Sequence, residues 1–489
     1  MTVRFPDLPI FRGDARPCRF EGEIRDLEVE GDIPPSIEGA FFRVMLDHQY
    51  PPMRGSDILL NGDGNVAAYY FRDGHVDYRQ RYVRTDRFRA ERKARQSLFG
   101  DYRNPFTDDP RVAGLIRGTG NTNIVFYDGK LLALKEDSPP YAMNPLTLET
   151  VKLWDFGGTF RSETFTAHPK FDPLTGDMVC FGYEASGLGE PDIAYYEYDA
   201  CGNLKHEAWF RTPYPGMVHD MVMTPNYVLF PIAPMVADLD QMKAGKPRFR
   251  FAPNLDQYFA VLPRGGTESD LRWFRGPCGL PGHTINAFES DGAIVFDSPM
   301  VAGNPFPWWP EAGNSAPPKG GFKSSIVRWV VDLQSSSDWI EPQEISPYLG
   351  ELPIIDGRFA GQPYRHFYMP FKDPDFPYDA AKAGAPALGF LLNSLLHIDL
   401  ANGKERKWHG GDTVALGEPV FIPRSTDAPE GDGHLIVPVH RHVEMTTELV
   451  ILDAGQIDAG PVATVKVPLH HRPCVHGNWV PASKLYGLP

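Results

Sequence analysis

The sequence contains no long apolar run. No segment reaches the roughly 18 consecutive apolar residues that a transmembrane helix needs, and residues 1–9, MTVRFPDLP, include no apolar stretch of signal-peptide length. The five cysteines are odd in number and widely separated, without a Cys-x-x-Cys pair. This pattern is typical of reduced thiols and not of a disulfide framework. We therefore expect a cytoplasmic protein with no integral membrane association.

Clustered positive charge is also lacking. The formal net charge is -15, the sequence pI is about 5.5, and no block of five or more basic residues occurs. The most basic stretch, residues 81–95, is interrupted by Asp86 and Glu91, which is typical of a solvated helix or strand edge. Binding to a phosphate backbone requires a concentrated basic face. Nucleic acid is therefore not an expected partner.

Long helical apolar patterns are absent, whereas turn signals are frequent. The 47 glycines and 48 prolines are spread along the whole chain. Short apolar runs flank Asp73, Asp128 and Asp291, each of which is followed by glycine. Asp-Gly between such runs is the strongest short-range signal for a β-hairpin. Repeated hairpins without a βα alternation favour a sandwich, a barrel or a propeller.

The length favours the propeller among these all-β folds. A single sandwich of 489 residues would be oversized, whereas four-stranded blades of about 40–50 residues each allow seven blades with room for loops. We predict one seven-bladed β-propeller domain over residues 1–489. Residues 304–321 and 371–387 are predicted to be long loops that form lids or binding rims, as a dome over the centre.

Four histidines occur in short and dissimilar frames that are far apart in the sequence. The frames are Thr-Ala-His168-Pro-Lys, Met-Val-His219-Asp-Met, Gly-His283-Thr-Ile and Val-His476-Gly-Asn-Trp. Each histidine lies within or beside an apolar, strand-like run. If a closed ring of strands brings them together, they offer four neutral nitrogens to one metal. Each histidine alone fits equally well a half-buried, hydrogen-bonding residue.

Three glutamates could support such a metal site. Metal-binding histidines need acceptors for their other ring N–H group. Glu136, Glu351 and Glu418 each lie at the edge of an apolar run, where an unpaired charge would be costly. A strand end at the surface would explain any one of them alone.

These motifs together resemble the carotenoid cleavage oxygenase family, and within it the lignostilbene dioxygenases. The resemblance covers nearly the whole chain, from residues 26–43 (DLEVEGDIPPSIEGAFFR) through Asn61-Gly-Asp-Gly to Val475-His476-Gly-Asn-Trp. It implies that the four histidines bind one Fe(II) per chain and that the three glutamates support them. It also implies a seven-bladed propeller and the oxidative cleavage of a carbon–carbon double bond by O2.

The same resemblance suggests a substrate. In the stilbene-cleaving members a tyrosine and a lysine hold the 4-hydroxyl group of the substrate, and Tyr102 and Lys135 occupy the matching frames. An ammonium group and a phenol hydroxyl would stabilise a bound phenolate and enrich the side-chain alkene in electrons. The expected substrate is therefore a small phenolic alkene, most simply a 4-hydroxystilbene. Lys135 alone could equally be a surface residue at a strand end.

Three further residues are predicted to line the pocket. Leu60 stands where lignostilbene-cleaving members carry an aromatic residue, so a stacking face of about 1 kcal/mol is missing. Thr122 matches a threonine that crowds the iron in relatives, although it could also be a turn hydroxyl. Phe306, in the aromatic loop, is a pocket residue or an exposed lid residue.

Several alternatives remain open at this point. Other stretches resemble isoeugenol monooxygenase, so cleavage of a phenylpropene to a benzaldehyde is the first alternative, and apocarotenoid cleavage is the second. A metal-free propeller that serves as a binding scaffold is an alternative of another class. The sequence does not decide the oligomeric state, and a homodimer is among the options.

Overall fold

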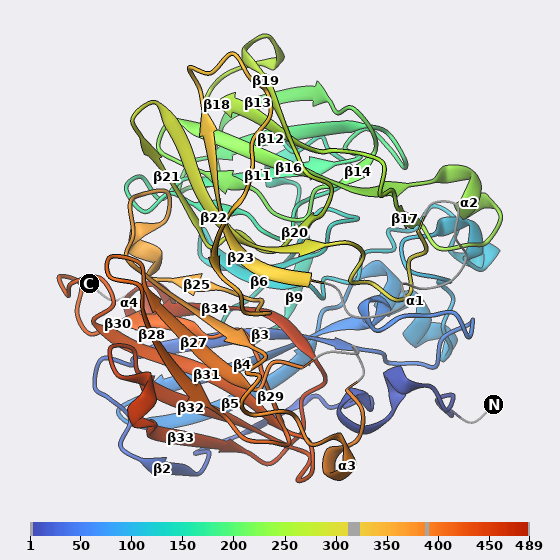
Figure 1. Ribbon diagram of the computed structural model, residues 1–489. Coiled ribbons are helices and arrows are strands. Elements are labelled where there is room, and N and C mark those ends of the chain that lie inside the picture. The colour runs from blue at the N-terminus through green and yellow to red at the C-terminus, as the bar shows by residue number, and fades with distance from the viewer. Residues whose placement is uncertain (1–2, 312–322, 387–390, 488–489) are drawn as a thin grey trace.

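The computed structural model describes residues 3–311, 323–386 and 391–487. Within these ranges the strands form seven antiparallel sheets, which we number as blades 1 to 7. The sheets are arranged as a seven-bladed β-propeller with few helices (Figure 1). The predicted fold is thus confirmed. The later parts of the two predicted loops, residues 312–321 and 387, lie outside the described residues.

Blades 1 to 4 contain the following strands. Blade 1 has β1 (Gly22–Ile24), β5 (His75–Tyr82), β4 (Asp63–Arg72), β3 (Gly39–Asp47) and β34 (Cys474–Pro481). Blade 2 has β6 (Asn123–Tyr127), β7 (Lys130–Leu134), β8 (Tyr141–Met143) and β9 (Thr150–Leu153). Blade 3 has β10 (Lys170–Phe171), β11 (Met178–Tyr183), β12 (Asp192–Tyr198) and β13 (Leu204–Arg211). Blade 4 has β14 (Gly216–Met217), β15 (Val222–Met223), β16 (Tyr227–Ala237), β17 (Phe249–Phe251), β18 (Gln257–Pro263) and β19 (Arg272–Gly276).

Blades 5 to 7 complete the ring. Blade 5 has β20 (Leu280–Pro281), β21 (Asn286–Ser290), β22 (Ala293–Ala302), β23 (Lys323–Asp332) and β24 (Gln343–Ser346). Blade 6 has β25 (Ile354–Ile355), β26 (His366–Phe371), β27 (Ser394–Asp399) and β28 (Lys404–His409). Blade 7 has β2 (Val29–Gly31), β33 (Pro461–Val467), β32 (Thr446–Asp453), β31 (Gly433–Arg441), β29 (Val414–Leu416) and β30 (Val420–Pro423).

The helices are short and lie in connections between strands or near the two ends of the chain. The α-helices are α1 (Asp86–Ala94), α2 (Leu239–Lys243), α3 (Ala380–Ala383) and α4 (Ala482–Tyr486). The 3-10 turns are η1 (Pro9–Phe11), η2 (Gly13–Ala15), η3 (Leu59–Asn61), η4 (Pro105–Thr107), η5 (Pro110–Val112), η6 (Phe156–Gly158), η7 (Glu268–Asp270), η8 (Gly357–Phe359) and η9 (Ile457–Ala459). In the part of the chain that the structure describes, we find no helix with the length and apolarity to cross a bilayer.

The Asp-Gly pairs form the tight hairpins that the sequence predicts. Asp73 and Gly74 join β4 to β5 with φ values of 51° and 78°, and Asp128 and Gly129 join β6 to β7 with 46° and 71°. Two successive positive φ values define the turn that matches the twist of paired strands. Glycine adopts the second position without steric cost.

The ring is closed twice by segments from opposite ends of the chain. The early strand β2 pairs with β33 in blade 7, and the late strand β34 pairs with β3 in blade 1. Figure 1 shows the blue β2 beside the red β33 at one edge of the molecule. Because a propeller leaves short sheet edges, this exchange fixes the two terminal segments and places β34 among the early strands.

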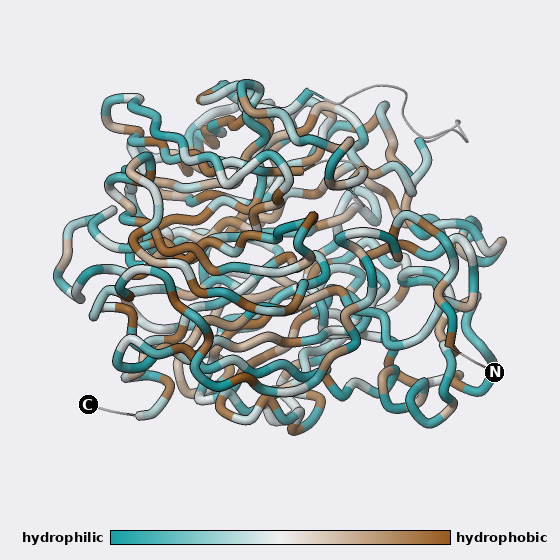
Figure 2. The backbone as a smooth tube through the Cα atoms, turned by 90° about the horizontal axis from the view of Figure 1, so that it is seen from below, coloured by the Kyte–Doolittle hydropathy of each residue, from teal (hydrophilic) through white to brown (hydrophobic). Residues whose placement is uncertain are grey.

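The core lies between neighbouring blades. Phe181 and Tyr195 of blade 3 pack against Phe230 of blade 4, with ring centroids 5.3 and 5.9 Å apart. Since both faces of most sheets are covered, strands such as β11 are buried at every position and show no alternation. Figure 2 shows apolar segments along the inner strands and hydrophilic ones in the outer loops.

Candidate metal centre and cavity

The four histidines converge at one point in the ring. His168 precedes β10, His219 lies between β14 and β15, His283 lies between β20 and β21, and His476 lies in β34. One ligand nitrogen from each lies within 4.8 Å of all the others. Each histidine lies in or directly beside an edge strand of blade 3, 4, 5 or 1, so these edges face the centre of the ring.

Three of the histidines are each paired with a different glutamate. His219 Nδ1 hydrogen-bonds to Glu136 Oε1, His283 Nδ1 lies 2.6 Å from Glu351 Oε2, and His476 Nδ1 lies 2.8 Å from Glu418 Oε1. Ionised carboxylates only accept hydrogen bonds, so each Nδ1 carries the proton and each Nε2 has a free lone pair. For His168 no carboxylate partner occurs among the described residues.

Further contacts hold each carboxylate in place. Glu136 Oε2 accepts hydrogen bonds from Arg103 Nη1 at 3.0 Å and from the Tyr183 hydroxyl at 2.7 Å. Although burial opposes it, the His219 ring and then Arg103 lower the pKa of Glu136 to about 2. Backbone N–H groups hold the other two, Leu352 N donating to Glu351 Oε2 and Gly477 N donating to Glu418 Oε2.

A glycine makes room for one of these pairs. A Cβ atom added at Gly282 would overlap Glu351 Oε1. The residue before His283 must therefore lack a side chain if the carboxylate is to reach the imidazole. The lack of room for a Cβ atom therefore explains why glycine precedes histidine in this motif.

The spacing of the ring nitrogens fits a metal ion. Nε2 of His283 lies 3.0 Å from Nε2 of His219 and 3.1 Å from Nε2 of His476. Nε2 of His168 lies 3.2 Å from Nε2 of His219. Facing lone pairs at these distances repel unless a cation lies between them. Metal–imidazole bonds of about 2.1 Å at right angles put neighbouring nitrogens about 3.0 Å apart. The carboxylates of the buried Glu136 and of the half-buried Glu351 and Glu418 add negative charge behind the rings, which a divalent cation would balance.

A cavity of about 340 Å³ opens beside the histidines. Its lining includes His219, His283, Glu136 and Glu351 together with all five residues that the sequence suggested for the substrate: Leu60, Tyr102, Thr122, Lys135 and Phe306. His168, His476 and Glu418 are not part of this lining. The loop after β22 contributes Phe306, Trp308 and Trp309, so part of the predicted aromatic loop faces the cavity.

Lys135 is buried, and only part of the hydrogen-bonding capacity of its ammonium group is used. Its Nζ donates to Leu60 O at 3.1 Å and to Asn121 Oδ1 at 3.0 Å, and it lies 4.8 Å from the centroid of the Tyr102 ring. An ammonium group has three donors, so one remains for a ligand. Burial lowers the pKa of Lys135 to about 8 and raises that of Tyr102 above its usual range. At neutral pH both groups are therefore hydrogen-bond donors.

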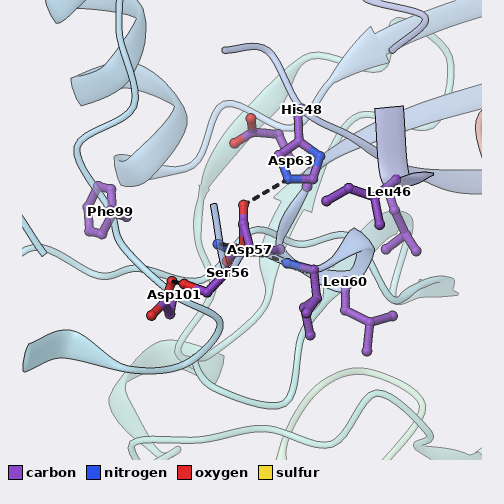
Figure 3. A network of polar contacts seen from close by, with 12 residues as sticks. Leu46, His48, Ser56, Asp57, Leu60, Asp63, Phe99 and Asp101 are labelled. Carbon is purple, nitrogen blue, oxygen red and sulfur yellow. Dashed lines mark hydrogen bonds and ion pairs between the residues drawn. The ribbon is translucent and has the colours of Figure 1, made fainter. Parts of the chain in front are cut away.

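The backbone beneath Leu60 is held by a polar network. His48 Nε2 lies 3.2 Å from Asp57 Oδ2, and Asp57 Oδ1 accepts a hydrogen bond from Asn61 Nδ2 at 2.7 Å. Figure 3 shows the His48–Asp57 pair with Leu46 and Leu60 to one side of it. Because the network fixes η3, the Leu60 carbonyl that binds Lys135 has a defined position.

Sequence reasoning missed several residues of this site. Asn121 positions Lys135, Arg103 holds Glu136, and Trp309 lies 6.0 Å from the Tyr102 ring. Asn121 directly precedes Thr122, and Arg103 directly follows Tyr102. Their position next to two predicted site residues was the only signal in the sequence that pointed to them. His440, His442 and His471 also line the cavity, although the sequence offered only their proximity in two pairs.

Comparison with known proteins places the chain among oxygenases. The family model described as retinal pigment epithelial membrane protein (RPE65) matches residues 15–481. Resveratrol cleavage oxygenase 1 of Aspergillus fumigatus is 45% identical over 98% of this chain and 97% of that protein. Isoeugenol monooxygenase of Pseudomonas nitroreducens is 43% identical over 97% of this chain and 98% of that protein.

A solved structure agrees with these relatives. The crystal structure of Pseudomonas brassicacearum lignostilbene dioxygenase superposes with a TM-score of 0.96 at 44% identity, covering 98% of this chain and 100% of that one. Fold, length and sequence therefore agree over almost the entire chain. The chain belongs to the RPE65 family, the carotenoid cleavage oxygenases.

Proposed function

We propose that this protein is an Fe(II)-dependent dioxygenase that cleaves the side-chain double bond of 4-hydroxyphenyl alkenes with O2, and that 4-hydroxystilbenes are its substrates. One observation carries the proposal: Lys135 and Tyr102 line the same cavity as His219 and His283. A phenol bound by the first pair would place its alkene near the candidate metal centre. The relatives named for lignostilbene, resveratrol and isoeugenol support the same chemistry.

The donor set favours iron as the metal. His168, His219, His283 and His476 would hold it through imidazole nitrogens, which suit first-row transition metals. Calcium prefers oxygen ligands, and a catalytic zinc usually has three protein ligands and one open position. Fe(II) bound here supplies the activation of O2, whereas Glu136, Glu351 and Glu418 keep three of the rings in the required tautomer.

Lys135 and Tyr102 would bind the 4-hydroxyl group of the substrate. The free donor of Lys135 and the Tyr102 hydroxyl both favour the phenolate form, because positive charge and donated hydrogen bonds lower the pKa of a phenol. The phenolate then releases electron density through the ring to the alkene. Addition of O2 to this electron-rich bond gives two carbonyl products, each carbon taking one oxygen atom, so the atoms balance.

The extent of the cavity favours stilbenes over phenylpropenes. Its lining also includes Leu392 of the loop before β27, and Leu416 and His440 of blade 7. A phenylpropene such as isoeugenol would leave this part empty, whereas the second ring of a stilbene would fill it. Cleavage of isoeugenol remains the alternative, since its namesake enzyme is almost equally similar.

A substrate panel tests the proposal. Protein reconstituted with Fe(II) would receive 4-hydroxystilbene, 4-methoxystilbene and isoeugenol, with O2 uptake and product masses recorded. We expect two aldehydes from 4-hydroxystilbene, less product from isoeugenol and very little from the methoxy compound. Protein stripped of metal serves as the control. Equal turnover of the hydroxy and methoxy compounds would contradict the role of the substrate phenolate. Faster turnover of isoeugenol than of 4-hydroxystilbene would show that phenylpropenes, and not stilbenes, are the substrates.

A further inference from the structure

His168 is held differently from the other three histidines of the candidate metal centre. Its ring has no carboxylate partner among the described residues, whereas each of the other three rings has a glutamate. A hydrogen bond to Nδ1 normally fixes the orientation of a ligand imidazole. The backbone N–H of His168 donates to Thr166 Oγ1 at 2.8 Å, but this contact does not involve the ring. The position of His168 therefore depends on the segment that carries it.

The segment that carries His168 is stiff. Proline follows it, and a residue before proline is driven to extended backbone because it would otherwise clash with the proline ring. Pro169 has a fixed φ angle, and Lys170 then begins β10. These three residues form a short rigid unit, so a contact that holds Lys170 also limits the movement of His168.

Asp220 makes that contact. Lys170 Nζ lies 2.7 Å from Asp220 Oδ1, and only 4% of the Asp220 side chain is exposed. A buried carboxylate cannot give up its partner without a cost in free energy, so the ion pair has a defined geometry. Asp220 directly follows His219. The pair therefore joins the segments of two candidate ligands, one from blade 3 and one from blade 4.

The second oxygen of Asp220 contacts a third ligand segment. Thr284 N donates to Asp220 Oδ2 at 2.8 Å, and Thr284 directly follows His283 of blade 5. Met221 N also donates to Asp220 Oδ1, at 2.7 Å, and further restrains the carboxylate. One carboxylate thus connects three of the four ligand segments.

We propose that Asp220 is a positioning residue of the metal centre and that it holds His168 in place through Lys170. The inference rests on the metal binding of the proposed function and does not depend on the substrate. The glutamates each act on a single ring, whereas Asp220 acts on the spacing between segments. A small displacement of Lys170 would take the His168 nitrogen away from the other three, and the affinity for a metal ion would fall.

Two single variants separate a positioning role from an electrostatic one. Asp220→Asn keeps the size of the side chain but removes a negative charge beside the histidines. Lys170→Met keeps the length of the side chain but removes a positive charge. If charge alone mattered, the first variant would bind a divalent cation more weakly and the second more tightly. A positioning role predicts weaker binding in both, because each variant breaks the same ion pair.

The affinity for Co(II), measured by competition with a chelator, is the first readout. We expect each single variant to lose about tenfold, within the range for residues that support metal ligands. The double variant should lose no more than either single variant, because both changes remove one shared contact. The visible absorption of bound Co(II) depends on ligand geometry and should shift in the same variants. Lys170→Arg keeps a charged donor and should restore most of the affinity.

Asp177→Asn is the matched control. Asp177 is likewise a buried carboxylate of blade 3 that pairs with a lysine, Lys205, but it lies in the connection between β10 and β11. The loss of a buried ion pair should lower stability here too, whereas Co(II) affinity and absorption should stay those of the wild type. Tighter binding in Lys170→Met, or unchanged binding in both test variants, would overturn the inference. Should Asp220→Asn not fold, the direction of the change in Lys170→Met decides by itself.

Failure of the inference can be told apart from failure of the proposed function. If Co(II) affinity depends on Asp220 as expected but the iron-loaded protein cleaves no 4-hydroxyphenyl alkene, the inference stands and the proposed function fails. If the iron-loaded protein cleaves 4-hydroxystilbene while both variants bind Co(II) like the wild type, only the inference is overturned. A wild type that binds neither ion would overturn both.

Discussion

Lys135 Nζ donates a hydrogen bond to Asn121 Oδ1 at 3.0 Å, and Asn121 Nδ2 donates in turn to Leu60 O at 3.0 Å. The Leu60 carbonyl is also the other acceptor for Lys135, at 3.1 Å. The three groups form a closed triangle that fixes the ammonium group and directs its remaining donor. The neutral side-chain amide of Asn121 thus positions the charged Lys135.

Replacing Asn121 by leucine should loosen this triangle without removing the lysine. We expect kcat/KM for 4-hydroxystilbene to fall about tenfold, the effect of one lost hydrogen bond. Cleavage of 4-methoxystilbene, which cannot form a phenolate, should change little, and iron content should stay the same. An equal loss with both substrates would show that Asn121 acts only on stability.

Replacing Lys135 by methionine should have a larger effect. The side chain keeps its length but loses the charge that stabilises the phenolate, and the loss of one such contact costs about 100- to 1000-fold in rate. The turnover of 4-hydroxystilbene measures this loss of activity, and the amount of bound iron shows whether the metal site is intact. Lys130→Met is the matched control and should keep full activity, because Lys130 lies at the opposite end of β7 from Lys135, over the Trp154 ring. Loss of iron in Lys135→Met would contradict the assigned role.

The activity should decline at alkaline pH. Burial lowers the pKa of Lys135 to about 8, with Asp137 and Glu136 opposing. The ammonium form predominates below that pH and is lost above it, so kcat/KM, which reports on the free enzyme, should fall as pH rises. Lys135→Arg stays charged throughout this range and should remove the decline. A rise in kcat/KM of the wild type from pH 7 to 9 would show that substrate ionisation dominates instead.

Replacing Glu418 by glutamine should weaken metal binding. The amide keeps the size of the side chain but removes the negative charge beside His476 Nδ1, 2.8 Å away. Loss of such a partner typically costs about 10- to 100-fold in metal affinity, which competition with a chelator would measure. Glu163→Gln changes an exposed glutamate and should have no effect. Unchanged affinity in Glu418→Gln would argue against a metal held by His476.

Replacing Leu60 by phenylalanine should strengthen stilbene binding. Leu60 lines the cavity without offering a ring face, and an aromatic pair contributes about 0.5–1.5 kcal/mol beyond buried area. We expect KM for 4-hydroxystilbene to fall about fivefold with kcat little changed. Leu174→Phe, at an exposed leucine, controls for added hydrophobicity. A higher KM would show that the cavity is too narrow for the larger side chain.

The sequence by itself determined the hairpins, and the number of blades was implied by its resemblance to a family. Asp-Gly pairs such as Asp73-Gly74 act locally, because their backbone preferences fix the turn wherever the chain folds. The frames around His168, His219, His283 and His476 also carried their own signal, since each resembles a family motif. These features depend on a few adjacent residues and can therefore be read along the chain.

Only the tertiary structure decided which groups meet. Which glutamate supports which histidine depends on how the blades are ordered around the ring, and His219 takes its partner from blade 2 while His476 takes one from blade 7. The contact of Asn121 with the Leu60 carbonyl likewise depends on a distance across blades. A linear pattern contains no such distances, because burial and hydrogen bonding between distant residues arise only when the ring closes.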